Sequence, residues 1–193
     1  IITTNGTPLN ARLAGHLLDG LYSIQVSLHA SSTALHRRLT GLSGFKDILA
    51  NIEHLARQRS ARSRERGLHL ALVSVLNSEN ARDMPELVKL AANLGVQELR
   101  FEYMTIFRPE QARLSCYFGQ NMANEAIGRA RLELERLKAP GVSVKFPPLF
   151  GGEGKASGLS EAQLRALERQ LGWAGSREGL RLERGLSFLA TTG

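Results

Sequence analysis

Residues 22–30, YSIQVSLHA, decide the fold of this chain, because apolar and polar residues alternate along them. The apolar side chains would share one face: Ile24, Val26 and Leu28. The polar side chains would share the other face: Ser23, Gln25, Ser27 and His29. Strict alternation of this kind predicts a β-strand with one apolar face. The polar face either turns toward water or lines a site, and the neighbouring segments decide between these alternatives.

The polar end of this strand is the first candidate for a binding site. Ser27 and His29 come directly before a segment with helical character. In parallel α/β sheets, ligands bind at the carboxyl ends of the strands. His29 is then either a general base or ligand, or a hydrogen-bonded residue of the rim.

Strand and helix alternate through the rest of the first half of the chain. We expect further strands over residues 1–5, 68–77 and 96–104. Helices are predicted to follow the strands: one capped by Thr7 with Pro8 in its first turn, then residues 31–39, 45–59 and 83–94. Connections of this length require parallel strands with right-handed crossovers. The sequence therefore predicts an α/β fold: a parallel sheet or a partial, truncated (β/α) barrel of the TIM type, followed by a helical tail.

The second part of the chain has a different character. Residues 124–137 show a charged amphipathic pattern that predicts a helix, extending back toward Gln120. Residues 141–146 predict a short edge strand, and the glycine-rich residues 151–154 predict a linker. A capping-box pattern predicts a last helix over residues 160–171.

These patterns divide the chain into two parts. We assign residues 1–110 to a partial barrel and residues 111–193 to an incomplete C-terminal helical extension or linker. A barrel slice with only the predicted strands of the first part would expose sheet edges at residues 1–5 and 96–104. We therefore expect the chain to aggregate or to need a further part.

Composition bounds the class of protein. The chain has 193 residues, of which 42% are hydrophobic and 22% charged, as in an ordinary globular protein. No apolar run reaches the roughly 18 residues of a membrane span, and no signal peptide opens the chain, so we expect no membrane partner. The single cysteine, Cys116, excludes an internal disulfide and favours a cytoplasmic location. The chain begins in a strand without an initiator Met, so we expect a fragment.

A basic stretch suggests a second class of function. The net charge of the chain is +7, and much of its excess of basic residues lies in residues 55–67, LARQRSARSRERG. Its arginines are Arg57, Arg59, Arg62, Arg64 and Arg66. No aromatic residue lies among them, so base stacking is not indicated. The stretch is either a solvated helix end or the binding surface of a basic α/β module for RNA or phosphate, without catalysis.

Polar residues lie at the carboxyl end of every predicted strand of the first half: Thr4, Asn5, Ser27, His29, Asn77, Glu102 and Thr105. In a parallel barrel these ends share one rim. Such a set suits a ligand rich in hydroxyl, amine and carboxylate groups. No Ser-His-Asp order with elbow glycines is present, and the histidines are scattered, so no catalytic residue and no metal site is assigned.

Several short motifs follow one another in a characteristic order: ITTNG, VSLHA, Leu39-Thr40-Gly41 after a His-Arg pair, SVLNSEN and ELVKLAANLGVQELRFEYM. Over about residues 1–107, this order resembles the second half of the core domain of radical S-adenosylmethionine (SAM) enzymes. The resemblance implies a partial (β/α)6 barrel. It also implies reductive cleavage of SAM at a [4Fe–4S] cluster, which generates a 5′-deoxyadenosyl radical.

The resemblance also implies roles for individual residues. Thr4 and Asn5 would lie near the nucleoside, and Ser27 would contact SAM. Arg38 would pair with the SAM carboxylate through its planar guanidinium. Asn77 matches the polar residue after the fifth strand of the family. His29 stands where many relatives have Asp.

Two further points follow from the resemblance. Thr40 replaces an arginine that is frequent in related sequences, and Arg37 would substitute if the pairing has shifted. The polar faces of two strands would line the lumen: Gln25, Ser27, His29, Glu98, Arg100 and Glu102.

One departure from the family concerns the cluster. The family binds its cluster through three cysteines in a CxxxCxxC loop, which this chain lacks, and Cys116 cannot replace them. We therefore expect a piece of a radical SAM enzyme whose cluster ligands lie outside this chain and which is inactive alone. Its substrate, a peptide or a small molecule, is not indicated by the sequence.

Overall fold

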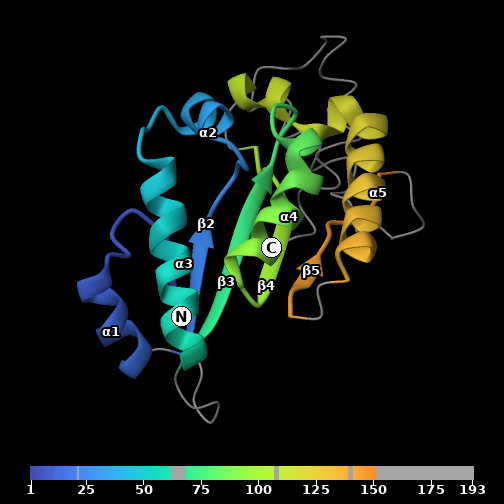
Figure 1. Cartoon of the computed structure of the whole chain (residues 1–193). Coiled ribbons are helices and arrows are strands. Elements are labelled where there is room, and N and C mark those ends of the chain that lie inside the picture. Colours follow the sequence, from blue (N-terminus) through green and yellow to red (C-terminus); the bar gives the residue numbers. More distant parts are fainter. Residues whose placement is uncertain (21, 62–67, 107–108, 139–140, 151–193) are drawn as a thin grey trace.

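The structure is a computed structural model that describes residues 1–20, 22–61, 68–106, 109–138 and 141–150. Its centre is a parallel sheet of five strands whose order follows the chain, β1-β2-β3-β4-β5 (Figure 1). The strands are β1 (Ile2–Thr4), β2 (Ser23–Ser27), β3 (His69–Leu76), β4 (Glu98–Tyr103) and β5 (Ser143–Lys145). The predicted α/β class with parallel strands is thereby confirmed.

Helices connect the strands. They are α1 (Ala11–Gly20), α2 (Thr33–Thr40), α3 (Phe45–Ala61), α4 (Met84–Leu94) and α5 (Gln120–Leu137), with short 3-10 segments η2 (Ala81–Asp83), η3 (Pro109–Leu114) and η4 (Cys116–Gly119). Two helices have well-defined caps. Ser32 accepts the amide of Leu35 at the start of α2, and Gly95 ends α4 in the left-handed conformation with φ 69°.

The first helix begins later than predicted. α1 starts at Ala11, and Oδ1 of Asn10 accepts the amide of Leu13 at 3.0 Å. The amide of Thr7 instead donates to Oδ1 of Asn5 at 3.1 Å. The prediction of Thr7 as the cap was therefore wrong, because two asparagine side chains bind the amides of this loop and postpone the helix.

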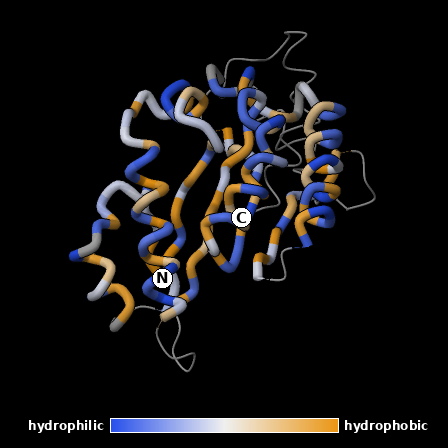
Figure 2. Tube along the Cα trace, viewed as in Figure 1, coloured by the Kyte–Doolittle hydropathy of each residue, from blue (hydrophilic) through white to orange (hydrophobic). Residues whose placement is uncertain are grey.

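One face of the sheet carries the hydrophobic core. The register aligns Ile24 with Leu70 and Leu72 with Leu99, all of which are fully buried. Side chains of α3 and α4 complete this core: Ile48, Ile52, Leu55, Leu87 and Ala91. Figure 2 shows the apolar residues running along the central strands. Each such aliphatic side chain contributes about 1.5–3 kcal/mol when fully buried, so this face dominates the stability.

The opposite face of the sheet is polar at many positions. The register aligns Gln25 with Ala71 and Val73 with Arg100, and it aligns Arg100 with Lys145. Side chains alternate along a strand, so Ser23, Gln25 and Ser27 of β2 share this face with the charged residues of β4. Those residues are Glu98, Arg100 and Glu102. β2 therefore has one apolar face and one polar face, as the alternation of residues 22–30 predicted.

β5 corrects the predicted position of one sheet edge. It pairs in parallel with β4, with Glu98 opposite Ser143 and Arg100 opposite Lys145. Residues 96–104 were predicted as an edge, and that prediction was wrong because β5 covers it. The short strand predicted near residues 141–146 is present and occupies the edge itself.

The second part of the described chain packs against the first. α5 contributes Ala123, Ala126, Ile127 and Ala130 to the same core as β3 and β4. The division near residue 110 stays a prediction, as do the linker and the helix predicted for residues 151–154 and 160–171, which lie outside the described residues.

Among the helices that the structure describes, none is long and apolar enough to cross a membrane.

Candidate functional site at the carboxyl edge of the sheet

The imidazole of His29 extends the pairing between β2 and β3. The backbone pairing reaches Leu28, whose amide donates to the carbonyl of Val73 at 3.0 Å. At the next step along β3, the amide of Val75 donates to Nδ1 of His29 at 3.1 Å. A side chain thus replaces a backbone carbonyl as acceptor where the strands begin to separate.

This hydrogen bond defines the protonation of His29. Burial lowers the pKa of the imidazole below its usual value, and the nearby His36 lowers it further. The ring is therefore neutral near pH 7, and its proton lies on Nε2 because Nδ1 is an acceptor. Nε2 has no hydrogen-bond partner among the described residues. The geometry favours a rim residue that donates a hydrogen bond over a general base.

Asn80 joins the ends of β2 and β3. Its buried side chain donates through Nδ2 to the carbonyl of His29 at 3.0 Å and to that of Val75 at 2.9 Å. Its Oδ1 accepts the amide of Asn77 at 2.8 Å. The sequence reasoning did not single out Asn80. The signal was available, because two asparagines three residues apart after a strand are typical of a turn closed by side chains.

Asp83 binds the loop that follows His29. Its two carboxylate oxygens accept hydrogen bonds from the amide and the hydroxyl of Ser31, each at 2.6 Å. Burial raises the pKa of Asp83, although the hydrogen bonds from Ser31 oppose this effect. Sequence reasoning placed Asp83 only at a helix start, since a contact across 52 residues leaves no local pattern.

Ser27 and His29 lie two residues apart at the carboxyl edge of the sheet. Ser27 is the last residue of β2, lies opposite Val73 and is half-buried. Residues two apart on a strand lie about 6.6 Å from each other. The hydroxyl of Ser27 and the Nε2–H of His29 are thus polar groups at the carboxyl edge of the sheet.

Three other predicted residues use their side chains in local turns. Oγ1 of Thr4 accepts the amide of Gly6 at 3.2 Å, and Oδ1 of Asn5 binds the turn that follows. Oδ1 of Asn77 accepts the amide of Glu79 at 2.8 Å. Their hydrogen bonds shape the loops after β1 and β3, and a ligand would compete with these turns for the same oxygens.

Arg38 is held by Glu79. Its Nε lies 3.3 Å from Oε2 of Glu79, and its Nη2 donates to the carbonyl of the same residue at 3.2 Å. Both side chains are more than one-third exposed, at 61% and 40%, so the ion pair is weak and exchangeable. Arg38 joins α2 to the loop after β3 and would bind a ligand carboxylate only by leaving Glu79.

A charged cluster occupies the same face on β4 and β5. Glu98, whose side chain is only 9% exposed, lies 2.7 Å from Arg100 and 2.8 Å from Lys145. Arg100 also lies 3.5 Å from the more exposed Glu102. Burial opposes ionisation of Glu98, but hydrogen bonds from Lys145 and Arg100 outweigh it and hold the pKa of this carboxyl below its usual value. The cluster attaches β5 to β4.

The residues present do not fit an iron–sulfur cluster. Cys116 is buried, and burial raises the pKa of its thiol to about 12, so the thiolate that binds iron is disfavoured. Within the described ranges, no group of three or more His, Cys, Asp or Glu residues is placed to hold a metal ion. A cluster would therefore need ligands from outside this chain.

The described part of the basic stretch is engaged by the protein itself. Arg57 lies 3.5 Å from Glu53 on the preceding turn of α3, and Arg59 donates to the carbonyl of Gly95 at 3.3 Å. The other arginines of the stretch, Arg62, Arg64 and Arg66, lie outside the described residues. The RNA- or phosphate-binding role of this stretch stays a prediction.

The sequence matches none of the known family models and none of the curated proteins with which it was compared.

Proposed function

We propose that the carboxyl edge of this sheet binds SAM and that the chain is the SAM-binding part of a radical SAM enzyme with a partial (β/α) barrel. One observation carries the proposal. Burial keeps His29 neutral, and the amide of Val75 occupies its Nδ1, so its Nε2–H is left to donate just beyond the carboxyl end of β2, which ends at Ser27. The order of sequence motifs supports the same assignment independently of the geometry.

The polar groups at this edge suit the chemistry of SAM. The ligand presents a carboxylate, an ammonium group, ribose hydroxyls and an adenine ring, which require both donors and acceptors. Ser27 can donate or accept through its hydroxyl, and His29 donates through Nε2. The loops after β1 and β3, shaped by Asn5 and Asn77, would lie at the ends of the neighbouring strands and bound the ligand.

Arg38 would act as the carboxylate partner in this proposal. Its exposed pair with Glu79 contributes about 0.2–1 kcal/mol, so a ligand carboxylate could replace Glu79 at little cost. Arg37 is exposed on the same helix and is the alternative partner. A guanidinium can bind a carboxylate through two parallel hydrogen bonds.

The reactivity of such an enzyme would come from the cofactor, since a [4Fe–4S] cluster supplies the electron that cleaves bound SAM. The single cysteine of this chain cannot hold that cluster. The residues described here would bind and orient SAM and exclude water from it. The substrate would meet the polar face formed by β2 and β4.

Two serines on the same face of β2 allow a matched test. Ser27 lies at the carboxyl end of the strand and Ser23 at its amino end. We expect Ser27→Ala to weaken SAM binding about fivefold, measured by equilibrium dialysis, because a ligand hydrogen bond is lost. Ser23→Ala should leave the affinity unchanged. Equal effects of both variants, or none from either, would refute a site at the carboxyl edge.

A further inference from the structure

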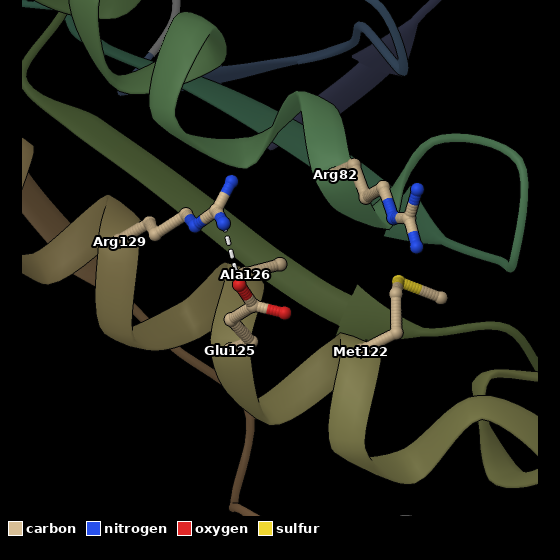
Figure 3. Close-up of a pocket in the computed structure, with 5 residues that line it drawn as sticks. All are labelled: Arg82, Met122, Glu125, Ala126 and Arg129. Atoms are coloured by element: carbon tan, nitrogen blue, oxygen red, sulfur yellow. Dashed lines mark hydrogen bonds and ion pairs between the residues drawn. The ribbon is translucent and has the colours of Figure 1, made fainter.

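A hollow lies between η2 and α5 (Figure 3). Its volume is about 210 Å³, and five residues line it: Arg82, Met122, Glu125, Ala126 and Arg129. At roughly 30 Å³ for each water molecule of the liquid, this space is large enough for a small polyatomic group.

The sequence explains why a hollow forms here. The lining residues of α5 follow the spacing of one helical stripe, so they face η2 together: Met122, Glu125, Ala126 and Arg129. Ala126 is buried and has a short side chain, which leaves space between its longer neighbours. On η2, Arg82 is exposed although the preceding Ala81 is fully buried.

The charges in the hollow are not balanced internally. Arg129 pairs with Glu125 one helical turn before it, and both side chains are largely exposed, at 69% and 60%. Such an exposed pair is weak. Arg82 has no hydrogen-bond or ion-pair partner among the described residues. In Figure 3 the carboxylate of Glu125 is paired with Arg129, and the guanidinium group of Arg82 lies apart from that pair, so the hollow holds two guanidinium groups and one carboxylate.

We propose that this hollow binds a phosphate-type oxyanion. Arg82 and Arg129 donate to its oxygens, and the anion displaces Glu125 from Arg129. Planar guanidinium forks bind phosphate oxygens through paired hydrogen bonds. Two guanidinium groups match the charge of a phosphate dianion better than that of a monovalent carboxylate.

The test is a titration of the full chain with inorganic phosphate, followed through the arginine Nε–H signals in NMR spectra. Arg82→Ala and Arg129→Ala should each weaken binding about fivefold. Glu125→Gln should strengthen it, because the competing carboxylate is lost. A stronger complex in this variant cannot arise from damage to the fold. All of these positions are exposed, so the core is not disturbed.

Arg136→Ala is the matched control. Arg136 lies on the same helix and pairs with Glu133, but it does not line the hollow. Its replacement should leave phosphate binding unchanged. The proposal is overturned if Arg136→Ala weakens binding as much as Arg82→Ala, since phosphate would then respond only to the net charge of +7. It is also overturned if Glu125→Gln fails to strengthen binding, or if acetate binds as tightly as phosphate.

Discussion

The amide of Val75 donates to Nδ1 of His29 at 3.1 Å, which makes a side chain of the loop after β2 part of the pairing with β3. Burial and the nearby His36 lower the pKa of the imidazole and keep it neutral, and the contact with Val75 leaves Nε2–H as its donor. His29 therefore contributes both to the pairing of β2 with β3 and to the proposed binding of SAM.

The titration of His29 predicts how stability depends on pH. Its pKa in the folded chain lies below the ordinary value of 6.5, so the unfolded chain binds the proton more readily. Stability should be complete above pH 6.5 and should fall as the pH decreases below that value. Denaturant unfolding at about pH 7.5 and about pH 5.5 measures this difference.

Replacement of His29 tests the assignment of that pH dependence. His29→Asn keeps a side-chain acceptor but removes the titrating group, so the loss of stability at low pH should become smaller. His16→Asn, at an exposed position on α1, should retain the full dependence. A dependence in His29→Asn as steep as in the unchanged chain would contradict the role assigned to this imidazole.

Asn80→Ala should be strongly destabilising. The change removes two donors to the carbonyls of His29 and Val75 and the acceptor for the amide of Asn77. At about 1–3 kcal/mol for each buried group left unpaired, we expect a loss of at least about 2 kcal/mol in the free energy of unfolding. Asn93→Ala, at an exposed position on α4, is the control and should change it by less than about 0.5 kcal/mol. Similar effects of the two changes would show that Asn80 does not join the strands.

Glu98→Gln should weaken the attachment of β5. The change removes the charge that binds Arg100 and Lys145, and we expect a cost of about 1–2 kcal/mol in urea unfolding, because both partners are partly exposed. The pKa of Glu98 is lowered in the folded chain, so its contribution is present near pH 7 and is lost as the pH falls through that pKa. Glu102→Gln, farther from Arg100 and more exposed, should cost less than about 0.5 kcal/mol. A larger effect at Glu102 than at Glu98 would refute this account of the cluster.

Local patterns predicted most of the fold. Alternation identified β2, and the predicted ranges 68–77 and 83–94 correspond to β3 and α4. The start of α1 was misplaced because Thr7–Pro8 satisfies the rules for a helix start, whereas the side chain of Asn5 accepts the amide of Thr7 and the side chain of Asn10 accepts the amide of Leu13. Sequence rules for helix caps do not decide whether Thr7 or the asparagine side chains accept the amides of this loop.

The candidate site was less accessible to sequence reasoning. Alternation placed Ser27 and His29 at one edge and on one face. It did not reveal that Asp83 binds Ser31 or that Asn80 reaches His29, since these partners lie 52 and 51 residues away along the chain, although the turn formed by Asn77 and Asn80 had a local signal. The pairing of Arg38 with Glu79 likewise depends on how α2 meets the loop after β3.

The central claim is that SAM binds at the carboxyl edge of β2. The most direct measurement is a titration of the isotopically labelled chain with SAM, followed through backbone amide signals and the imidazole signals of His29. We predict saturable shifts of the signals of Ser27, His29 and Val75, with the exposed Leu132 on α5 unaffected. Unchanged signals at these three residues, or shifts confined to the basic end of α3, would contradict the account.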